Sequence, residues 1–192
     1  MHAVADAERL FEAEALPHLN MLYRTAVRLT VNRTEAEDLV QDVYAQAWRS
    51  FASYTPGTNC RAWLFKILMN KLEHQRRRRY ALLKRTAETD AELLAQTLAY
   101  VPPVGQELRD EEVLAALGRT PARFREVVLL ADVEEFSYRE IAQILGVPVG
   151  TVMSRLSRGR KLLREMLAGV ASGYGIGVAP PRSRSTRTAA AA

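Results

Sequence analysis

The chain has little of what catalytic or disulfide-stabilised proteins need. Its 192 residues include one cysteine and three histidines. The single thiol, Cys60, excludes an internal disulfide and a zinc site built from several thiolates. The histidines His2, His18 and His74 are scattered and form no catalytic constellation with it. The sequence therefore argues against an enzyme, and we expect no catalytic residue, no metal and no cofactor.

Long apolar runs and aromatic residues are also scarce. No apolar stretch approaches the about 18 residues that cross a membrane, and the first residues lack the basic-then-apolar pattern of a signal peptide. We therefore expect a soluble, cytoplasmic protein without membrane insertion. Aromatic residues are 7% of the chain, and β-branched residues rarely alternate with polar ones, which favours helix over sheet. The 48% hydrophobic content suffices for a core.

Charge is divided into blocks along the chain. Residues 61–85 hold nine Lys or Arg residues against one acid, whereas residues 86–112 hold seven acids against one arginine. Basic character returns after Ser154, and the formal net charge is +5. Such a distribution favours a polyanionic partner, most simply nucleic acid.

Apolar residues recur at helical spacing through the first half. They predict three helices, with apolar faces over residues 19–29, 36–51 and 63–72. Thr34 and Glu37 have the spacing of a capping box for the second helix. Pro56–Gly57 then breaks the pattern within SYTPGT. The third helix leads into four consecutive arginines, Arg76–Arg79.

The chain is predicted to be all-α, with two small helical domains joined by a flexible acidic linker. The linker gathers acids around Pro102–Pro103 and has at most a helical turn near residues 91–98. In the second domain, Thr120 resembles a helix cap with proline following at the first helical position. The tail, rich in Gly, Pro, Ser, Arg and Ala, is predicted to be disordered. The expected boundaries are 1–80, 81–110 for the linker, 111–168, and 169–192 for the tail.

The clearest motif is a helix-turn-helix in SYREIAQILGVPVGTVMSRLSRGRKLL, residues 137–163. Ser137 and Glu140 form a capping box, and Gly146 provides the turn. Pro148 then starts a second helix. On that helix, hydroxyl and guanidinium groups face outward, which suits base edges and phosphates in a major groove. The alternative is a helical hairpin with a basic exposed face.

Two separated motifs resemble the extracytoplasmic-function group of bacterial sigma factors. They are AEDLVQDVYAQAWRSF with the following WLFKILMNKLEHQRR, and FREVVLLADVEEFSYREIAQILGVPVGTVMSRLSRGRKLLR. With their flanks they cover most of residues 8–168. The second motif is most similar to the subgroup controlled by zinc-containing, redox-responsive anti-sigma factors.

The resemblance implies a specificity subunit of RNA polymerase that has no catalysis of its own. Its region 2 would grip the clamp helices of the largest polymerase subunit and capture the melted −10 strand. Its region 4 would read the −35 duplex and rest on the flap of the second-largest subunit. An anti-sigma factor is an expected further partner, because a free sigma factor of this kind would act unchecked.

Polymerase contacts are implied for the DLVQDVYAQAW segment. The polar residues of that helix that can face outward are Asp38, Gln41, Asp42 and Gln46. The alternative is an acidic solvated face with Trp48 in the core. Two carboxylates four residues apart could also hold a metal ion, but no histidine or further acid cluster supports that.

Contacts to the −10 strand are implied for the broken loop and the third helix. The amide of Asn59 can both donate to and accept from a flipped base, whereas Thr58 is equally well a helix cap. Cys60 beside it is expected to be a packing residue rather than a redox switch. The candidates for −10 binding are Thr58, Asn59, Asn70, Lys71, His74, Arg76 and Arg77.

Contacts to the −35 duplex are implied for the second helix of the helix-turn-helix. Ser154 and Arg158 are the leading base-edge candidates. Met153 and Ser157 depart from the family pattern. The full candidate set is Thr151, Ser154, Arg155, Ser157, Arg158, Arg160 and Lys161, of which Arg155, Arg160 and Lys161 suit phosphate better. Two other functions compete with a sigma factor: a conventional helix-turn-helix regulator and a metal-dependent nuclease.

Overall fold

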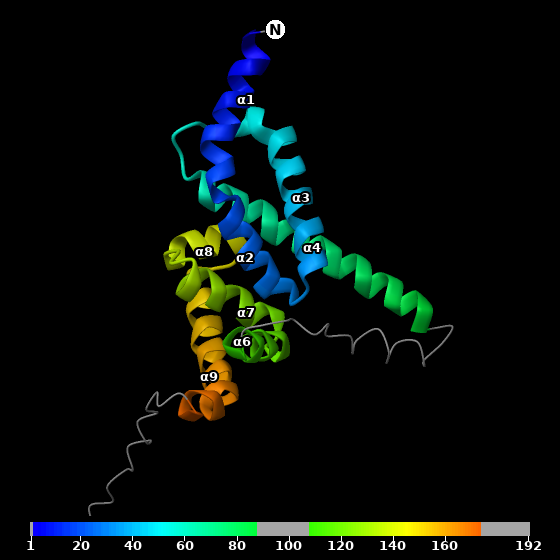
Figure 1. Ribbon diagram of the computed structural model, residues 1–192, viewed down its shortest axis with the longest axis vertical. Coiled ribbons are helices and arrows are strands. Elements are labelled where there is room, and N and C mark those ends of the chain that lie inside the picture. Colours follow the sequence, from blue (N-terminus) through cyan, green and yellow to red (C-terminus); the bar gives the residue numbers. More distant parts are fainter. Residues whose placement is uncertain (1, 88–107, 174–192) are drawn as a thin grey trace, which may run out of the picture.

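The computed structural model describes the backbone of residues 2–87 and 108–173, and the side chains within 6–84 and 111–168. Within these ranges the chain is helical and has no strand, which confirms the all-α prediction. We name residues 2–87 the N-terminal module and residues 108–173 the C-terminal module. The two modules lie against each other, and the end of α4 projects from the body (Figure 1).

The N-terminal module packs its helices around one apolar core. Leu22, Leu39, Leu64 and Phe65 are fully buried there. The sequence periodicity predicted this inward face, and the structure confirms it. The elements are α1 (His2–Ala15), η1 (Leu16–His18), α2 (Leu19–Thr30), α3 (Arg33–Ser50), η2 (Phe51–Ser53) and α4 (Cys60–Ala87).

The capping box predicted at Thr34 and Glu37 is wrong by two residues. The N-cap of α3 is Asn32, whose side-chain oxygen accepts a 3.1 Å hydrogen bond from the Glu35 amide. The preceding residue, Val31, ends α2 in the left-handed region at φ 57°. A sharp turn therefore places the amide side chain of Asn32, which is a stronger cap than threonine, at the helix start.

The loop after η2 is closed by polar contacts around Pro56–Gly57. Gly57 has φ 77°, where glycine carries no Cβ penalty. The Thr58 hydroxyl donates to the Thr55 carbonyl at 2.7 Å, so it does not cap α4. The cap is Asn59, whose side-chain oxygen accepts from the Ala62 amide at 2.9 Å. From there α4 runs through all four arginines to Ala87, inside the segment predicted to be a linker.

The C-terminal module consists of α6 (Leu108–Arg119), α7 (Ala122–Val128), the π-helical segment η3 (Leu129–Val133), α8 (Tyr138–Leu145) and α9 (Val149–Gly173). Thr120 is not the cap of α7, contrary to the prediction. Its buried hydroxyl instead donates to the Ala116 carbonyl at 2.9 Å, which makes it part of the end of α6. Pro121 occupies the cap position of α7 instead.

The helix-turn-helix forms as predicted. Ser137 and Glu140 make a reciprocal capping box, and Gly146 ends α8 in the left-handed region at φ 64°. Pro148 directly precedes α9. Gly159 lets α9 approach α7 closely, because a Cβ there would lie 3.2 Å from the Phe124 carbonyl oxygen. The turn and the close helix crossing together fix the direction of α9.

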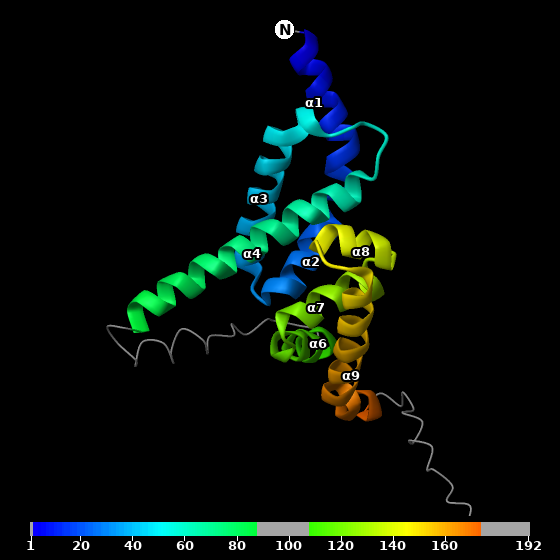
Figure 2. The ribbon, with the colours of Figure 1, turned by 180° about the vertical axis from the view of Figure 1, so that it is seen from behind.

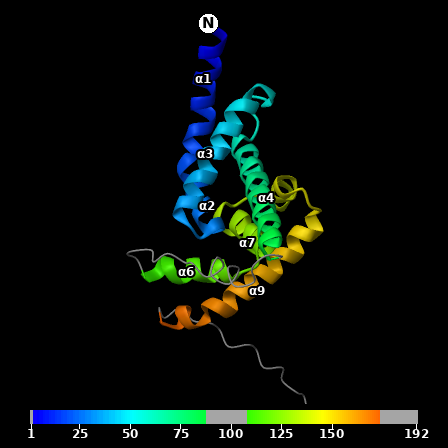
Figure 3. The ribbon, with the colours of Figure 1, turned by 90° about the vertical axis from the view of Figure 1, so that its right-hand side faces the viewer.

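The modules share a continuous core. Buried residues of α2, α3 and α4 belong to the same cluster as those of α7, η3, α8 and α9. α8 lies alongside the first half of α4, and α2 lies against α6 and α7 (Figures 2 and 3). Of the predicted linker, 81–110, residues 88–107 with the turn near 91–98 lie outside the described residues, as does the predicted tail from residue 174 onward.

Candidate nucleic-acid interface

The predicted polymerase-binding residues form one outward face of α3. Asp38, Gln41 and Asp42 are exposed, and Gln46 is half-buried. The opposite face packs into the core through a separate set of residues, Leu39, Val40, Val43 and Ala47. Because acids and amides stand four residues or fewer apart, they offer a row of hydrogen-bond acceptors to a partner.

Trp48 is not a core residue, in contrast to the packing alternative raised by the sequence. Its side chain is 43% exposed and makes an edge-to-face contact with Phe11, with ring centroids 5.2 Å apart. The other tryptophan, Trp63, is partly buried and packs against Tyr54 at 4.9 Å between centroids. α3 therefore presents an apolar ring next to its acidic face, which is a common composition for a protein-binding surface.

Asn59 lies at the start of α4 and faces the C-terminal module. Its side-chain oxygen caps the helix, and its amide nitrogen donates to a Glu140 carboxylate oxygen at 2.8 Å. The Glu140 carboxylate also accepts from Ser137, and these hydrogen bonds are the largest reason why its pKa is lowered from 4.5. The oxygen and the nitrogen of the Asn59 side-chain amide, which was predicted to contact a −10 base, are therefore both engaged in hydrogen bonds within the chain.

Further −10 candidates lie along α4, toward its projecting end. Asn70, His74 and Arg77 are exposed on one stripe, while Lys71 is half-buried. This stripe lies opposite the core residue Leu68, as the helical spacing predicts. The structure therefore brings these polar groups to one accessible line of the helix.

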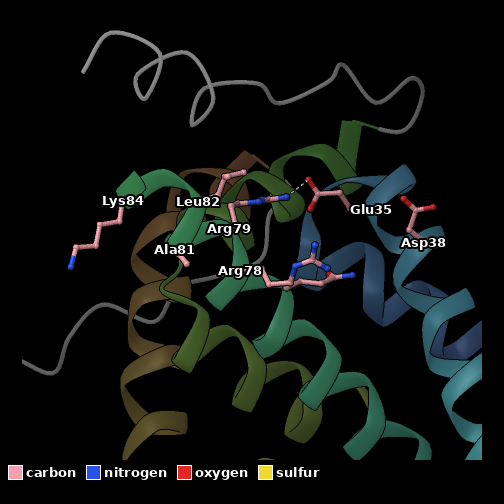
Figure 4. A pocket seen from close by; sticks show the side chains of 8 residues that line it. Glu35, Asp38, Arg78, Arg79, Ala81, Leu82 and Lys84 are labelled. Carbon is pink, nitrogen blue, oxygen red and sulfur yellow. Dashed lines mark hydrogen bonds and ion pairs between the residues drawn. The ribbon is translucent and has the colours of Figure 1, made fainter. Parts of the chain in front are cut away.

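The four arginines do not act as one unit. Arg76 pairs with Glu126 of the C-terminal module, and Arg77 pairs with Glu73 one turn earlier. Arg79 pairs with Glu35 on α3 at 2.8 Å. Figure 4 shows this last pair beside Arg78 and Asp38, on the rim of an open pocket between α3 and the projecting end of α4. Within the described residues Arg78 makes no ion pair, so the run has both paired and unpaired charge.

Most of the predicted −35 residues lie on the outer side of α9, whereas Arg155 is half-buried and lines a pocket against the N-terminal module. Ser154, Ser157, Arg158 and Lys161 are exposed, and Thr151 is half-buried near the helix start. Val152 and Leu156 are buried, so the predicted inward face is confirmed. The outward face therefore alternates hydroxyl and guanidinium groups over about three turns.

Arg160 is already paired. It makes a two-pronged contact to Asp132, with Nε 3.0 Å and Nη2 2.5 Å from the carboxylate oxygens. These contacts raise the pKa of the Arg160 guanidinium above its usual range. Lys161 lies 3.9 Å from Glu165 in an exposed, weak pair. A phosphate would have to displace Asp132 from Arg160, whereas Arg158 has no such partner among the described residues.

A pocket between the modules joins candidates for both DNA elements. Asn70 and Arg76 line it from α4, and Arg155 lines it from α9, in a cavity of about 360 Å³. The motifs did not predict this meeting, because Arg155 belongs to a different motif from Asn70 and Arg76. The ion pair between Arg61 and Glu134, at 3.3 Å, was likewise not predicted.

Cys60 is buried at the first residue of α4, as a packing residue would be. Its side chain is 6% exposed, and burial raises the pKa of the thiol above 9.0. Burial likewise raises the pKa of Tyr44 and of Tyr54 to about 12. A thiol that ionises with difficulty is a poor nucleophile, so the packing interpretation of Cys60 is supported.

Family models match both halves of the chain. The family described as Sigma-70 region 2 matches residues 16–81, and the family described as Sigma-70, region 4 matches residues 110–163. The ECF RNA polymerase sigma factor EcfG of Rhodopseudomonas palustris is 37% identical over 74% of this chain and 76% of that protein. The ECF RNA polymerase sigma factor SigE of Mycolicibacterium smegmatis is 38% identical over 79% of this chain, which spans only 59% of that relative.

Two solved structures have a similar fold. One is the sigma factor RpoE in complex with the anti-sigma factor NepR from Bartonella quintana, with a TM-score of 0.69 and 35% identity over 82% of this chain and 96% of that chain. The other is CnrH in complex with the cytosolic domain of CnrY, with a TM-score of 0.60 and 29% identity over 86% of this chain and 94% of that chain. Both superpositions cover more of the chain than either module contains, so both modules contribute to them.

Proposed function

The chain belongs to the extracytoplasmic-function sigma factors of the sigma-70 family, and from that premise we propose that it directs core RNA polymerase to a specific set of promoters. The observation that carries the proposal is that one chain holds two modules with different exposed chemistry. The N-terminal module presents an acidic α3 face beside a basic α4, and the C-terminal module presents a capped helix-turn-helix. A conventional regulator needs only the second of these.

We infer that α3 binds the clamp helices of the largest polymerase subunit. Its acceptor row, Asp38, Gln41, Asp42 and Gln46, is free of the inter-module contact and remains accessible. The neighbouring exposed ring of Trp48 adds apolar area to the same side of the helix. The C-terminal module would rest on the flap of the second-largest subunit, as its resemblance to region 4 implies.

We propose that the −10 strand follows α4. Asn59 would test a flipped base, and Asn70, Lys71 and His74 would line the unpaired strand. Arg76 and Arg77 would hold phosphates without reading sequence, because their contribution is electrostatic. Thr58, which is bonded to its own loop, would shape the base pocket rather than contact DNA through its hydroxyl.

We propose that α9 enters the major groove of the −35 duplex. Ser154 and Arg158 are exposed toward solvent on the face that would meet base edges. Arg155, Arg160 and Lys161 would position the helix through phosphates, with Thr151 and Ser157 at the edge of the contact. The boundaries proposed for the two functional units remain 1–80 and 111–168, with 81–110 between them and 169–192 beyond.

The protein would act without catalysis of its own, in the cytoplasm, where polymerase is found. Its relatives are sigma factors, and the described residues contain no cluster of three or more His, Cys, Asp or Glu side chains that could hold a metal ion. No helix of the described part of the chain is long and apolar enough to cross a bilayer.

We propose an anti-sigma factor as a further partner. Two structurally similar sigma factors were solved in complex with such proteins, NepR in one case and CnrY in the other. An anti-sigma factor would need to cover the accessible α3 face or hold the two modules together. The narrower resemblance to the subgroup with zinc-containing anti-sigma factors stays a prediction.

Holoenzyme assembly tests the proposal. Purified core polymerase is mixed with the full chain, passed over a size-exclusion column, and the complex is then challenged with promoter DNA and heparin. A sigma factor co-elutes with core polymerase and yields heparin-resistant promoter complexes. Sequence-specific binding of duplex DNA by the chain alone, without co-elution, would instead indicate a conventional helix-turn-helix regulator.

A further inference from the structure

Glu14 of α1 attaches the loop between η2 and α4, residues 54–59, to the body of the N-terminal module. Its Oε2 atom accepts a 2.5 Å hydrogen bond from the Tyr54 hydroxyl, and its Oε1 atom accepts from the Gly57 amide at 3.3 Å. The loop runs beside α1 before it enters α4 (Figures 1 and 2). One half-buried carboxylate therefore contacts the loop at its first residue and at its middle.

Tyr54 is the one buried residue of the loop, whereas residues 55–59 are exposed. Its ring stacks on Phe51 with centroids 5.5 Å apart and packs against Trp63 at 4.9 Å. Burial and the hydrogen bond to Glu14 raise the pKa of Tyr54 to about 12. The hydroxyl therefore stays protonated at neutral pH and remains a donor to the carboxylate.

The helix that carries Glu14 is held in place by contacts that do not involve the loop. Phe11 lies one turn earlier on α1, is buried, and makes an edge-to-face contact with Phe51 at 5.1 Å between centroids. The Ala15 carbonyl oxygen accepts from the Tyr44 hydroxyl of α3 at 2.8 Å. These contacts fix α1 against α3, and they thereby set the position of the Glu14 carboxylate.

The exposed part of the loop has few other attachments. The hydroxyl and the amide of Thr58 both donate to the Thr55 carbonyl, at 2.7 and 3.3 Å, which closes the turn without attaching it to another element. Among the described residues, hydrogen bonds join this loop to elements distant in sequence through two carboxylates, those of Glu14 and Glu140. Glu140 belongs to the C-terminal module, so the N-terminal module itself supplies the attachment through Glu14.

We propose that Glu14 is a positioning residue for −10 recognition, which holds the loop in the shape in which Thr58 and Asn59 meet a flipped base. The inference rests on the proposed function, because that function assigns a base contact to this loop. Glu14 precedes residues 16–81, the part of the chain that the Sigma-70 region 2 model matches. It acts on DNA through the loop and touches no base itself.

Preorganisation is the physical reason why a residue away from the DNA alters base selection. An exposed loop that samples several conformations loses that freedom when it closes on a base, and this loss lowers the affinity. A loop that is already held avoids most of the loss. A loosened loop also discriminates less between bases, because discrimination depends on donors and acceptors being held in the productive geometry. The loss is confined to the base position that the loop contacts.

The test compares variants that weaken the attachment while keeping the packing. Glu14→Gln removes the charge that both hydrogen bonds use, and Tyr54→Phe removes one donor but retains the ring. The matched control is Glu12→Gln, which removes the same charge from an exposed position on the same helix. Asn59→Ala marks the base position that the loop contacts. Circular dichroism confirms that each full-length variant retains its helix content.

Two measurements are made on each protein. Hydrogen–deuterium exchange, followed by mass spectrometry, reports on the amides of the loop. Holoenzyme reconstituted with core polymerase then selects open complexes from a promoter library that is randomised across the −10 element upstream of a mapped start site. Sequencing of the retained DNA gives the base preference at each position.

We expect the parent and Glu12→Gln to share slow exchange in the loop and one pattern of base preference. Glu14→Gln and Tyr54→Phe should exchange faster in the loop. They should also lose base preference by about two- to tenfold, the equivalent of one hydrogen bond, at the position that Asn59→Ala also affects. Preferences at the other −10 positions should stay as in the parent.

Three results would overturn the positioning role. Unchanged exchange in both loop variants would show that the carboxylate does not hold the loop. Faster exchange with the parent's base preferences would show that the order of the loop does not govern base selection. A loss spread evenly over the −10 positions, or placed where Asn59→Ala has no effect, would show that Glu14 does not act through this loop.

Failure of the proposed function would look different. A parent holoenzyme without base preference at any −10 position would remove the −10 assignment, and the positioning role with it. The exchange data would then still establish whether Glu14 holds the loop.

Discussion

The Asn59 side-chain amide donates a 2.8 Å hydrogen bond to the Glu140 carboxylate, joining the start of α4 to the start of the helix-turn-helix. Each residue is also part of a helix cap: Asn59 accepts from the Ala62 amide, and Glu140 accepts from the Ser137 amide at 2.9 Å. Two helix starts therefore share one polar contact. A change at either residue acts on local helix stability and on the inter-module contact together.

Ser137→Ala should destabilise the C-terminal module. The substitution removes the hydroxyl that accepts from the Glu140 amide and donates to its carboxylate. Losing an N-cap of this kind costs about 1 kcal/mol. The measurement is the free energy of unfolding in urea, followed by circular dichroism. Ser157→Ala is the control, since that serine is exposed within α9 and alanine is a good helix former. Equal losses in both variants would contradict the capping role.

Acid should lower the free energy of unfolding, partly through protonation of the Glu140 carboxylate. Hydrogen bonds from Ser137 lower the pKa of this carboxyl below 4.5 in the folded chain. A lowered folded pKa means that the stabilisation is present above the unfolded pKa and is lost as the pH falls through the folded one. We therefore expect the free energy of unfolding to drop more steeply below pH 4.5 in the parent than in Glu140→Gln.

Urea unfolding at a series of pH values from about 6 to 3 gives both curves, across the range where carboxylates titrate. Glu112→Gln serves as the control and should follow the parent. The interpretation would be wrong if Glu140→Gln and the parent lost stability in parallel, because the titrating group would then lie elsewhere.

Arg158→Ala should weaken −35-dependent initiation with little loss of core-polymerase binding. Arg158 is exposed on α9 and has no ion pair within the described residues, so it is available to a base edge. One good base contact is worth about 1–3 kcal/mol, or about 5- to 150-fold in affinity. Initiation is compared on promoters with intact and scrambled −35 elements, with Arg119→Ala on α6 as the control. An equal loss of polymerase binding would refute the assignment.

Asp42→Arg should impair polymerase association and leave the helix-turn-helix intact. Asp42 is exposed on the acidic face of α3, so charge reversal there opposes a partner without disturbing the core. A pull-down with core polymerase measures the association, and Glu111→Arg on α6 is the charge-matched control. Normal recovery of polymerase by Asp42→Arg would place the binding surface elsewhere.

Most of the fold could be predicted from local patterns. The 3.6-residue periodicity identified the inward residues of α3 and α4, and the capping box with Gly146 identified the helix-turn-helix. These signals are readable because they lie within one helix or one turn. The cap at Thr34 was wrong because Asn32 is a stronger cap and the turn at Val31 places it at the helix start. The cap at Thr120 was wrong because its hydroxyl donates back to the Ala116 carbonyl of α6.

The contact between the modules could not be predicted, because its partners are distant in sequence. Glu134 is acidic and follows an apolar run, a pattern that usually marks a solvated turn, yet it is buried against Thr25 and Arg61. None of these three residues belongs to a periodic pattern or motif that would predict such a contact. Helical spacing predicted which −35 candidates on α9 face solvent. The ion pair of Arg160 with Asp132 could be found only in the three-dimensional structure.

Transcription in vitro tests the central claim most directly. Purified core polymerase is supplied with genomic DNA of the host bacterium, with and without the full chain, and the 5′ ends of the transcripts are mapped. We predict a discrete set of start sites that appears only with the chain and shares common −35 and −10 sequences. Core polymerase that stays promoter-blind when the chain is added would contradict the assignment as a sigma factor.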